Sequence, residues 1–421
     1  MPITMIGVYL IIMNKIKTCK KCLYNTSHSL GLVVDDSGIC SGCRIHEEKN
    51  SLDWRHRWEI LESLVADYRC KDKRNYDCII PVSGGMDAYF IVHIVKEKLG
   101  LNPLLVTYNK YWNTPLGIRN LVNLRIRFNC DILTQNVNPH SVKRIVKTTL
   151  RSFGSIYWHC IAGQTVFPVQ VAVRKKVPLI IWGAHQGMEQ VGMFSHEHEV
   201  EMTRRYRKDH DLMGFEADDL LSDFDVLSEG DVWQYRYPED EELNSVGVRG
   251  IYLNNYIRWD PKAQHELMIA KYAYETANFS RTFDCYDFVD CYNYMNLRDL
   301  IKYYKTGISK VSDHATREIR HGRLLRKDAL GLVAYHQSFK PSYIDMFCEW
   351  LGTNQRSLEY VLDGHRNKDI WEQDYDNNWK LKNQANVLKK HNLPNNIQFI
   401  QNSSFARDIG HGYITIGKGY P

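Results

Sequence analysis

The stretch YDCIIPVSGGMDAYFIVHIV, residues 76–95, constrains the fold more than any other part of the chain. Its first half is an apolar run typical of a buried strand, and its second half has the spacing of a helix. Glycine lets the backbone approach an anion closely and adopt positive φ, and a helix N-terminus offers unpaired N–H groups. The sequence therefore predicts a phosphate-binding turn between a buried strand and a helix that begins at about Asp87.

The alternation of strand and helix continues after this turn. Apolar runs at 77–82, 104–108, 131–135 and 178–183 predict strands, and helical spacing is found near 87–99, 117–128, 139–151 and 163–176. Such alternation is typical of βαβ units. We therefore expect an α/β fold with a doubly wound, mostly parallel sheet.

Two CxxC pairs precede the α/β pattern, at Cys19/Cys22 and Cys40/Cys43. Each pair can point two thiolates at one ion, and two pairs supply the four sulfurs of a tetrahedral zinc site. Disulfides or unrelated thiols are the alternatives. The remaining cysteines have no framework spacing, which favours a reducing compartment, the cytoplasm. An all-sulfur site is closed, so we expect a zinc ribbon in which the metal is structural.

Composition and charge limit the possible classes of partner. The chain has 421 residues, 44% hydrophobic and 24% charged, with a formal net charge of +5. This mild excess fits anionic small molecules and is too weak to indicate nucleic acid. The apolar run from Met5 to Met13 is too short to span a bilayer and lacks the features of a signal peptide. The acidic run PEDEEL, 238–243, is interpreted as a solvated loop.

We expect four parts in chain order: a disordered leader (1–17), the zinc ribbon (18–50), the α/β domain (51–245) and a mostly helical substrate or partner region (246–421).

The turn SGGMD resembles the PP-loop of the ATP pyrophosphatases, whose usual form is SGGxD followed by Ser or Thr. The turn lacks the GKS/T ending of a Walker loop and the GxGxxG of a dinucleotide fold. The resemblance implies a HUP-like fold whose loop binds the pyrophosphate end of ATP through Ser83, Gly84, Gly85, Met86, Asp87 and Ala88. Relatives often have Lys at the position of Met86 and a hydroxyl at that of Ala88. Each missing charge-assisted hydrogen bond would cost on the order of 1.5–3 kcal/mol.

Longer phrases carry a closer resemblance over nearly the whole chain, including NTPLGIRNLVNL (113–124), GIYLNNYIRWD (250–260) and VSDHATREIRHGRLLRKDAL (311–330). They look like the N-acetyl sugar amidotransferases of bacterial surface-polysaccharide (lipopolysaccharide O-antigen) and pseudaminic acid pathways. This resemblance implies ATP- and Mg²⁺-dependent conversion of the acetamido group of a nucleotide sugar into an acetamidino group. It also implies that a glutaminase and a cyclase-like partner supply ammonia. No glutaminase Cys-His-Glu unit is recognisable in the chain.

Ligands of open α/β sheets bind beyond the carboxyl ends of the strands, which makes Tyr108, Gly183 and His185 candidate nucleotide contacts. His185 could instead only order its turn. Asp87 is either a Mg²⁺ or ATP contact or a helix cap. Glu189 is a candidate second magnesium ligand.

The phrase SDHATREIRHGR, 312–323, is the candidate substrate-binding segment. Asp313, Arg317 and Arg320 would share one face of a helix, and the two guanidinium groups could hold a phosphate or diphosphate. His314 could act as acid or base, which makes it and Arg317 catalytic candidates beside Asp87. The alternative interpretation of this segment is an exposed helix with many charges.

Two other functions remain open. A tRNA-modifying PP-loop enzyme with a zinc ribbon is one, although the weak net charge and the absence of a paired catalytic thiol around Cys160 argue against it. A degenerate, non-catalytic scaffold for the glutaminase partners is the other, and Met86 and Ala88 are the reason to consider it.

Overall fold

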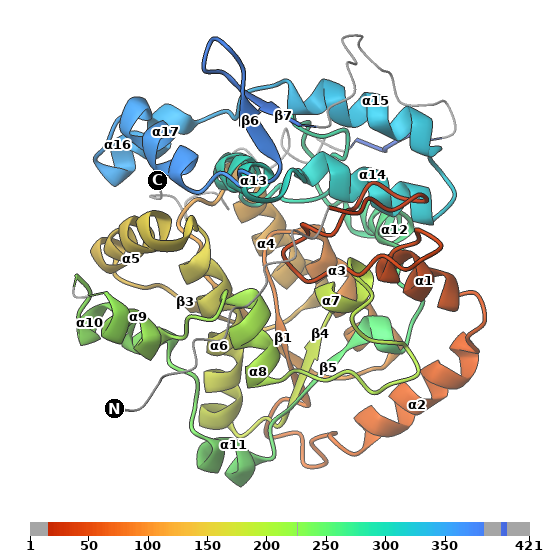
Figure 1. The fold of residues 1–421 in the computed structure, drawn as a ribbon. Coiled ribbons are helices and arrows are strands. Elements are labelled where there is room, and N and C mark those ends of the chain that lie inside the picture. Colours follow the sequence, from red (N-terminus) through yellow and green to blue (C-terminus); the bar gives the residue numbers. More distant parts are fainter. Residues whose placement is uncertain (1–15, 225, 383–396, 402–421) are drawn as a thin grey trace, which may run out of the picture.

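A five-stranded parallel sheet forms the centre of the computed structural model, which describes residues 16–224, 226–382 and 397–401 (Figure 1). The predicted leader therefore lies almost entirely outside the described residues. The strand order is β3-β2-β1-β4-β5, and every neighbouring pair is parallel. The strands are β1 (Cys78–Pro81), β2 (Pro103–Tyr108), β3 (Ile132–Gln135), β4 (Leu179–Trp182) and β5 (Arg249–Tyr252).

The four predicted strands are confirmed, whereas β5 was not predicted. Residues on β1 alternate between the two faces of the sheet: Ile80 belongs to one core cluster and Ile79 to another. A sheet that is buried on both faces requires apolar residues at nearly every position. The sequences of these strands are therefore continuous apolar runs. The strand β5 lies beyond residue 245, so the sheet extends into the segment expected to form only the C-terminal region.

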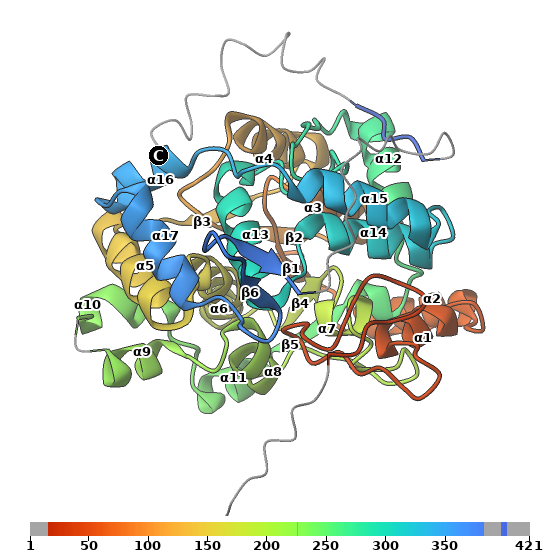
Figure 2. The same cartoon turned by 45° about the horizontal axis from the view of Figure 1, so that its top comes forward.

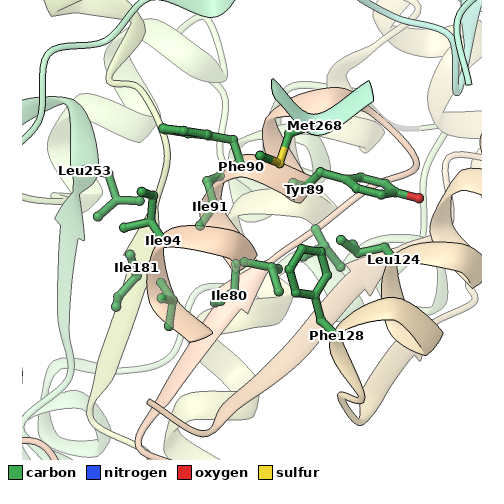
Figure 3. Packing of buried hydrophobic residues seen from close by; sticks show 14 of the residues in the cluster. Ile80, Tyr89, Phe90, Ile91, Ile94, Leu124, Phe128, Ile181, Leu253 and Met268 are labelled. Atoms are coloured by element: carbon green, nitrogen blue, oxygen red, sulfur yellow. The ribbon is translucent and has the colours of Figure 1, made fainter. Parts of the chain in front are cut away.

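Helices cover both faces of the sheet, as a doubly wound fold requires. One face packs against α3 (Met86–Val92), its continuation as a π-helix (His93–Lys98), α4 (Pro115–Phe128) and α12 (Pro261–Tyr272). Figure 3 shows Ile80 and Ile181 of the sheet packed with Phe90, Phe128 and Met268 from these helices. The opposite face packs against α6 (Trp158–Lys175), whose Val166 and Val169 are fully buried.

The local sequence explains where the main helices begin and end. Thr114 and Asn138 cap α4 and α5 (Pro139–Phe153), and each cap is followed by a proline at the first helical position. Asn129 and Gly154 end these helices in the left-handed conformation.

The acidic run expected to be a loop is instead the start of α11 (Asp240–Val246). Glu239 and Glu242 form a capping box there, and carboxylates near a helix N-terminus are favoured by the helix dipole. The other short helices are α7 (Gln186–Glu189), α8 (Arg204–Tyr206), a π-helix (Arg207–Asp211), α9 (Ala217–Asp223), α10 (Glu229–Val232) and the 3₁₀ turns Trp233–Tyr235 and Leu253–Asn255.

The C-terminal region is a helical layer across the carboxyl ends of the strands. It contains α13 (Tyr292–Thr306), α14 (Lys310–Arg320), α15 (Arg326–Gln337), α16 (Ile344–Leu351), α17 (Gln355–Gly364) and a hairpin of β6 (Trp371–Gln373) and β7 (Trp379–Leu381). In Figures 1 and 2, α13 lies between α5 and α6 on one side and α14 on the other. No helix in the described part of the chain has the length and apolar character needed to cross a membrane.

The cysteine-containing module precedes the sheet and contacts both other parts of the molecule. Short bridges join Thr18 to Asn25 and Val34 to Cys40, and the module continues into α1 (Ser41–Glu48) and α2 (Trp54–Ala66). Its small core includes Val191, from the segment after β4, and Ile308, from the turn between α13 and α14. The ribbon is therefore packed between the sheet domain and the helical layer.

Candidate functional site

A cleft of about 780 Å³ opens at the carboxyl ends of the strands. It lies where the direction of the strand order in the sheet reverses, between β1 and β4. This switch point is where open α/β sheets bind ligands. The loops after β1, β2 and β4 form one wall of the cleft, and α13 and α14 form the other.

The turn after β1 has a different backbone from the one expected. Neither Gly84 nor Gly85 has a positive φ; Gly85 is extended and caps α3. The Oγ atom of Ser83 accepts a hydrogen bond from the N–H of Gly85 at 3.1 Å. Gly84 is needed for packing instead, because a Cβ there would lie 2.0 Å from the carbonyl oxygen of Gly117 at the start of α4. Close backbone contact thus fixes the turn.

Gly84→Ala is expected to destabilise the protein by about 1–3 kcal/mol, because the added methyl group must push the start of α4 away from the turn. Urea unfolding measures this change. Gly364→Ala is the matched control, since it also lies outside the left-handed region and a Cβ there meets nothing within 4 Å. Equal unfolding midpoints for the two variants would contradict the packing role.

The first three residues of α3 have different environments. Met86 and Asp87 line the cleft, whereas Ala88 is buried in the core cluster below. The carboxylate of Asp87 is 48% exposed, and its Oδ1 lies 3.0 Å from Nε2 of His265 on α12. His265 is fully buried, and sequence reasoning missed it. The imidazole engages one carboxylate oxygen of a side chain that stays half exposed and lines the cleft, an arrangement typical of an oriented metal ligand.

Lys110, just beyond β2, is a second residue that sequence reasoning missed. It lines the cleft, and its Nζ lies 2.7 Å from Oδ2 of Asp290. Burial opposes its charge, but the carboxylate of Asp290 raises the pKa of Lys110 well above its ordinary value. A permanent cation therefore lies in the wall of the cleft near the glycine turn, whose Gly85 also approaches Asp290.

The candidate nucleotide contacts from the strand ends are mostly engaged elsewhere. Tyr108 is buried, and its hydroxyl bonds to Tyr235 at 2.8 Å and to His159 at 3.0 Å. Gly183 packs closely on Ile91, and a Cβ there would lie 2.8 Å from that side chain.

His185 orders its own turn. Its Nδ1 accepts a hydrogen bond from the N–H of Met188, and burial lowers the pKa of His185 to about 4. The residues of this turn that line the cleft are Ala184, Gln186, Glu189 and Gln190.

Glu189 lines the cleft but already has cationic and amide partners. Its oxygens lie 2.7 and 2.9 Å from Nζ of Lys49, and Asn254 donates to Oε1 at 3.0 Å. Lys49 would oppose a second cation at this position, so Glu189 does not fit a magnesium ligand.

The four candidates on α14 all line the cleft, and each has partners within the chain. Asp313 pairs with Lys302 at 2.6 Å, and His314 lies between Thr282 at 2.6 Å and Asp287 at 3.1 Å. Arg317 pairs with Asp284 and Glu318 at 2.6 and 2.7 Å.

Arg320 connects the ribbon to the turn after β4. It donates to the carbonyl of Glu189 at 2.8 Å, lies 3.6 Å from Sγ of Cys40 and covers the ring of Tyr24. Its position is thus explained by the cysteine cluster, and a substrate would have to compete with these contacts.

The four cysteines of the ribbon form a group that can bind a metal ion such as zinc. All four are fully buried, and their sulfurs lie within 4.8 Å of one another. The Sγ atoms of Cys22 and Cys40 are 3.6 Å apart, close to the ~3.8 Å expected between thiolates on one tetrahedral zinc. The predicted cluster is confirmed, and its closed, all-sulfur donor set fits a structural metal.

Two comparisons with known proteins found similarity to this chain. Residues 274–386 match the family described as LPS biosynthesis protein WbpG-like, C-terminal domain. The chain is also similar to an uncharacterized protein of Methanocaldococcus jannaschii, with 24% identity over 118 residues. That match covers 28% of this chain and 42% of the relative, less than half of its length. The WbpG-like segment contains α13 and α14, and therefore one wall of the cleft, and it indicates a role in lipopolysaccharide biosynthesis.

Proposed function

We propose that the chain is the synthetase half of an ATP-dependent amidotransferase that converts the acetamido group of an N-acetylated sugar into an acetamidino group. One observation carries the proposal: Met86 and Asp87 of the SGGMD turn line the same cleft as the WbpG-like helices α13 and α14. The PP-loop resemblance of the turn supports ATP, and the lipopolysaccharide description of the helices supports a sugar. A phosphate-binding turn alone would not indicate what the second substrate is.

The chemistry needs activation of a poor electrophile. The amide oxygen of the sugar attacks the α-phosphorus of ATP, and pyrophosphate leaves. Ammonia then attacks the activated carbon, and AMP departs with the former amide oxygen while a proton is released. Charge develops on the phosphorus oxygens, so cations aimed at that point contribute most to the rate.

The residues of the cleft fit these roles unequally. In this proposal the turn from Ser83 to Met86 binds the pyrophosphate end of ATP, with Met86 as its member that lines the cleft, and Asp87 holds Mg²⁺. Magnesium, when bound, neutralises phosphate charge; Asp87 fits it because its half-exposed carboxylate lines the cleft. In this proposal Lys110 supplies the cation that Met86 lacks while it stays paired with Asp290.

Ammonia is supplied by the glutaminase and cyclase-like pair in this proposal, and the sugar carries a nucleotide. ATP and reduced cysteines favour the cytoplasm as the place of reaction.

The test incubates the protein with ATP, Mg²⁺, ammonium and a panel of nucleotide-linked N-acetyl sugars, and measures AMP and sugar mass by mass spectrometry. We expect AMP only when both sugar and ammonium are present, with a product about one mass unit lighter from exchange of O for NH. Formation of ADP, or turnover without ATP, would exclude the mechanism. Absence of AMP even with the glutaminase pair would favour the scaffold.

A further inference from the structure

The wall of the cleft formed by α13 carries cations that the rest of the chain does not neutralise. Most cations lining the cleft are paired with carboxylates, as Lys110, Lys302, Lys310 and Arg317 are. Arg298 and Lys305 line the same cleft, and neither has a carboxylate partner within 4 Å among the described residues. The spacing 298, 302, 305 places these side chains on one face of α13.

The partners of the two side chains orient them without cancelling their charge. The guanidinium carbon of Arg298 lies 4.0 Å from the centre of the Tyr157 ring, and Lys305 donates to the carbonyl of Phe153 at 2.9 Å. Burial lowers the pKa of Lys305, as expected for an ammonium group that has lost water without gaining a counter-ion.

One carboxyl group on the neighbouring wall of the cleft is close enough to Arg298 to influence it. Burial raises the pKa of Asp211 to about 7, and Arg207 and Arg298 oppose this rise. Burial therefore opposes ionisation of Asp211.

The ribbon adds a polar group beside this face. Ser27 donates to the carbonyl of Thr306 at 2.6 Å, which holds the ribbon loop against the last turn of α13. The next residue, His28, lines the cleft and is 4% exposed. Its Nδ1 accepts from the N–H of Leu30, and its Nε2 has no hydrogen-bond partner in the described part of the chain. Burial first, and then Lys302, lower the pKa of His28 to about 3, so Nε2 carries a proton.

We propose that Arg298 and Lys305 form an anion subsite that binds a phosphate or carboxylate group of the sugar substrate, with His28 as an additional N–H donor. The subsite lies on α13, apart from the glycine turn, so it leaves that turn free for ATP. A guanidinium group held on an aromatic ring and a long flexible ammonium group suit a diphosphate or a sugar acid. Only the identity of the ligand as a sugar rests on the proposed function.

The experiment titrates the full-length protein by calorimetry while α,β-methylene-ATP and Mg²⁺ fill the nucleotide site. The probes are UDP-N-acetylglucosamine, N-acetylglucosamine 1-phosphate, glucuronic acid and uncharged N-acetylglucosamine. We take the anionic probes that bind to the wild-type protein. For each of them, Arg298→Gln and Lys305→Met are expected to raise the Kd about tenfold. They are expected to leave binding of the ATP analogue unchanged. Binding of the phosphate probes or of glucuronic acid tells which anion the subsite prefers.

Two further variants separate a binding role from a structural one. Lys305→Arg keeps the charge and should retain affinity, and Lys327→Met removes an exposed cation of α15 that does not line the cleft. The subsite is excluded if wild-type protein binds no anionic probe more tightly than N-acetylglucosamine, or if Arg298→Gln and Lys305→Met bind as wild type does. AMP formation is measured separately, so a subsite without AMP formation would contradict only the proposed reaction.

Discussion

Asp87→Asn should reduce AMP formation about 100-fold or more while the protein remains folded. The substitution keeps the size of the side chain and removes the negative charge, which is the property a magnesium ligand needs. Loss of one group that stabilises developing charge typically costs 10²–10³ in rate, about 2.7–4 kcal/mol. The exposed position of the carboxylate at the cleft implies little effect on unfolding. Initial rates of AMP release at saturating ATP give the effect on catalysis.

Two variants show whether Asp87 acts through its charge. Asp223→Asn makes the same chemical change at an exposed residue that does not line the cleft, and it should keep wild-type activity. His265→Gln retains a donor for Asp87 but loosens its orientation. We expect a loss of about tenfold that is partly recovered at high Mg²⁺, since positioning partners of metal ligands affect affinity by 10–100-fold. Wild-type rates for Asp87→Asn would exclude a metal-binding role and leave Asp87 as a first-turn carboxylate paired with His265.

Removal of metal from the four-cysteine cluster should lower the melting temperature by about 10 °C or more. The ribbon buries few apolar residues of its own, chiefly Tyr24, Leu32 and Val34. Metal binding in such small modules supplies free energy that their cores do not. Without the ion, four thiol groups would face one another in a buried space. A loss of several kcal/mol shifts the midpoint by 2–4 °C per kcal/mol in a domain of 150–250 residues.

The double variant Cys40→Ser/Cys43→Ser removes half of the ligands, and thermal unfolding together with zinc content by mass spectrometry measures the result. Cys70→Ser is the matched control, because Cys70 is half-buried and lies outside the cluster. The control should keep both zinc and melting temperature. A double variant that loses zinc and melts as wild type does would show that the metal is not structural.

The parts of the molecule that could be predicted from the sequence depend on short-range patterns. Apolar runs identified β1 to β4, and the CxxC spacing identified the cysteine cluster, because in each case the signal lies within a few residues. The short strand β5, RGIY, was missed because it is followed directly by turns and aromatic residues that resemble the helical region.

The rest of the site depends on pairs distant in sequence. Lys110 meets Asp290 and Asp87 meets His265, across separations of 180 and 178 residues. No local pattern reveals such a pair. For the same reason the roles expected of Glu189 and Arg320 changed, since Lys49 and the cysteine cluster, which engage them, come from the N-terminal module.

The packing around Gly117 has a consequence for how the protein folds. Gly84 contacts Gly117 on one side, and a Cβ on Gly117 would lie 2.3 Å from Cα of Asp290 on the other. The N–H of Thr114 donates to the carbonyl of Asp290 at 3.0 Å, which joins the same segments. The backbones of Gly84, Gly117 and Asp290, the first and last of them 206 residues apart in the chain, thus stack directly on one another. When a ribosome has released only the first 245 residues, the SGGMD turn is complete, but the segment that contains Asp290 has not yet been made. The turn and the start of α4 therefore reach their final packing only after that segment emerges. We expect competence for nucleotide binding to arise late in synthesis.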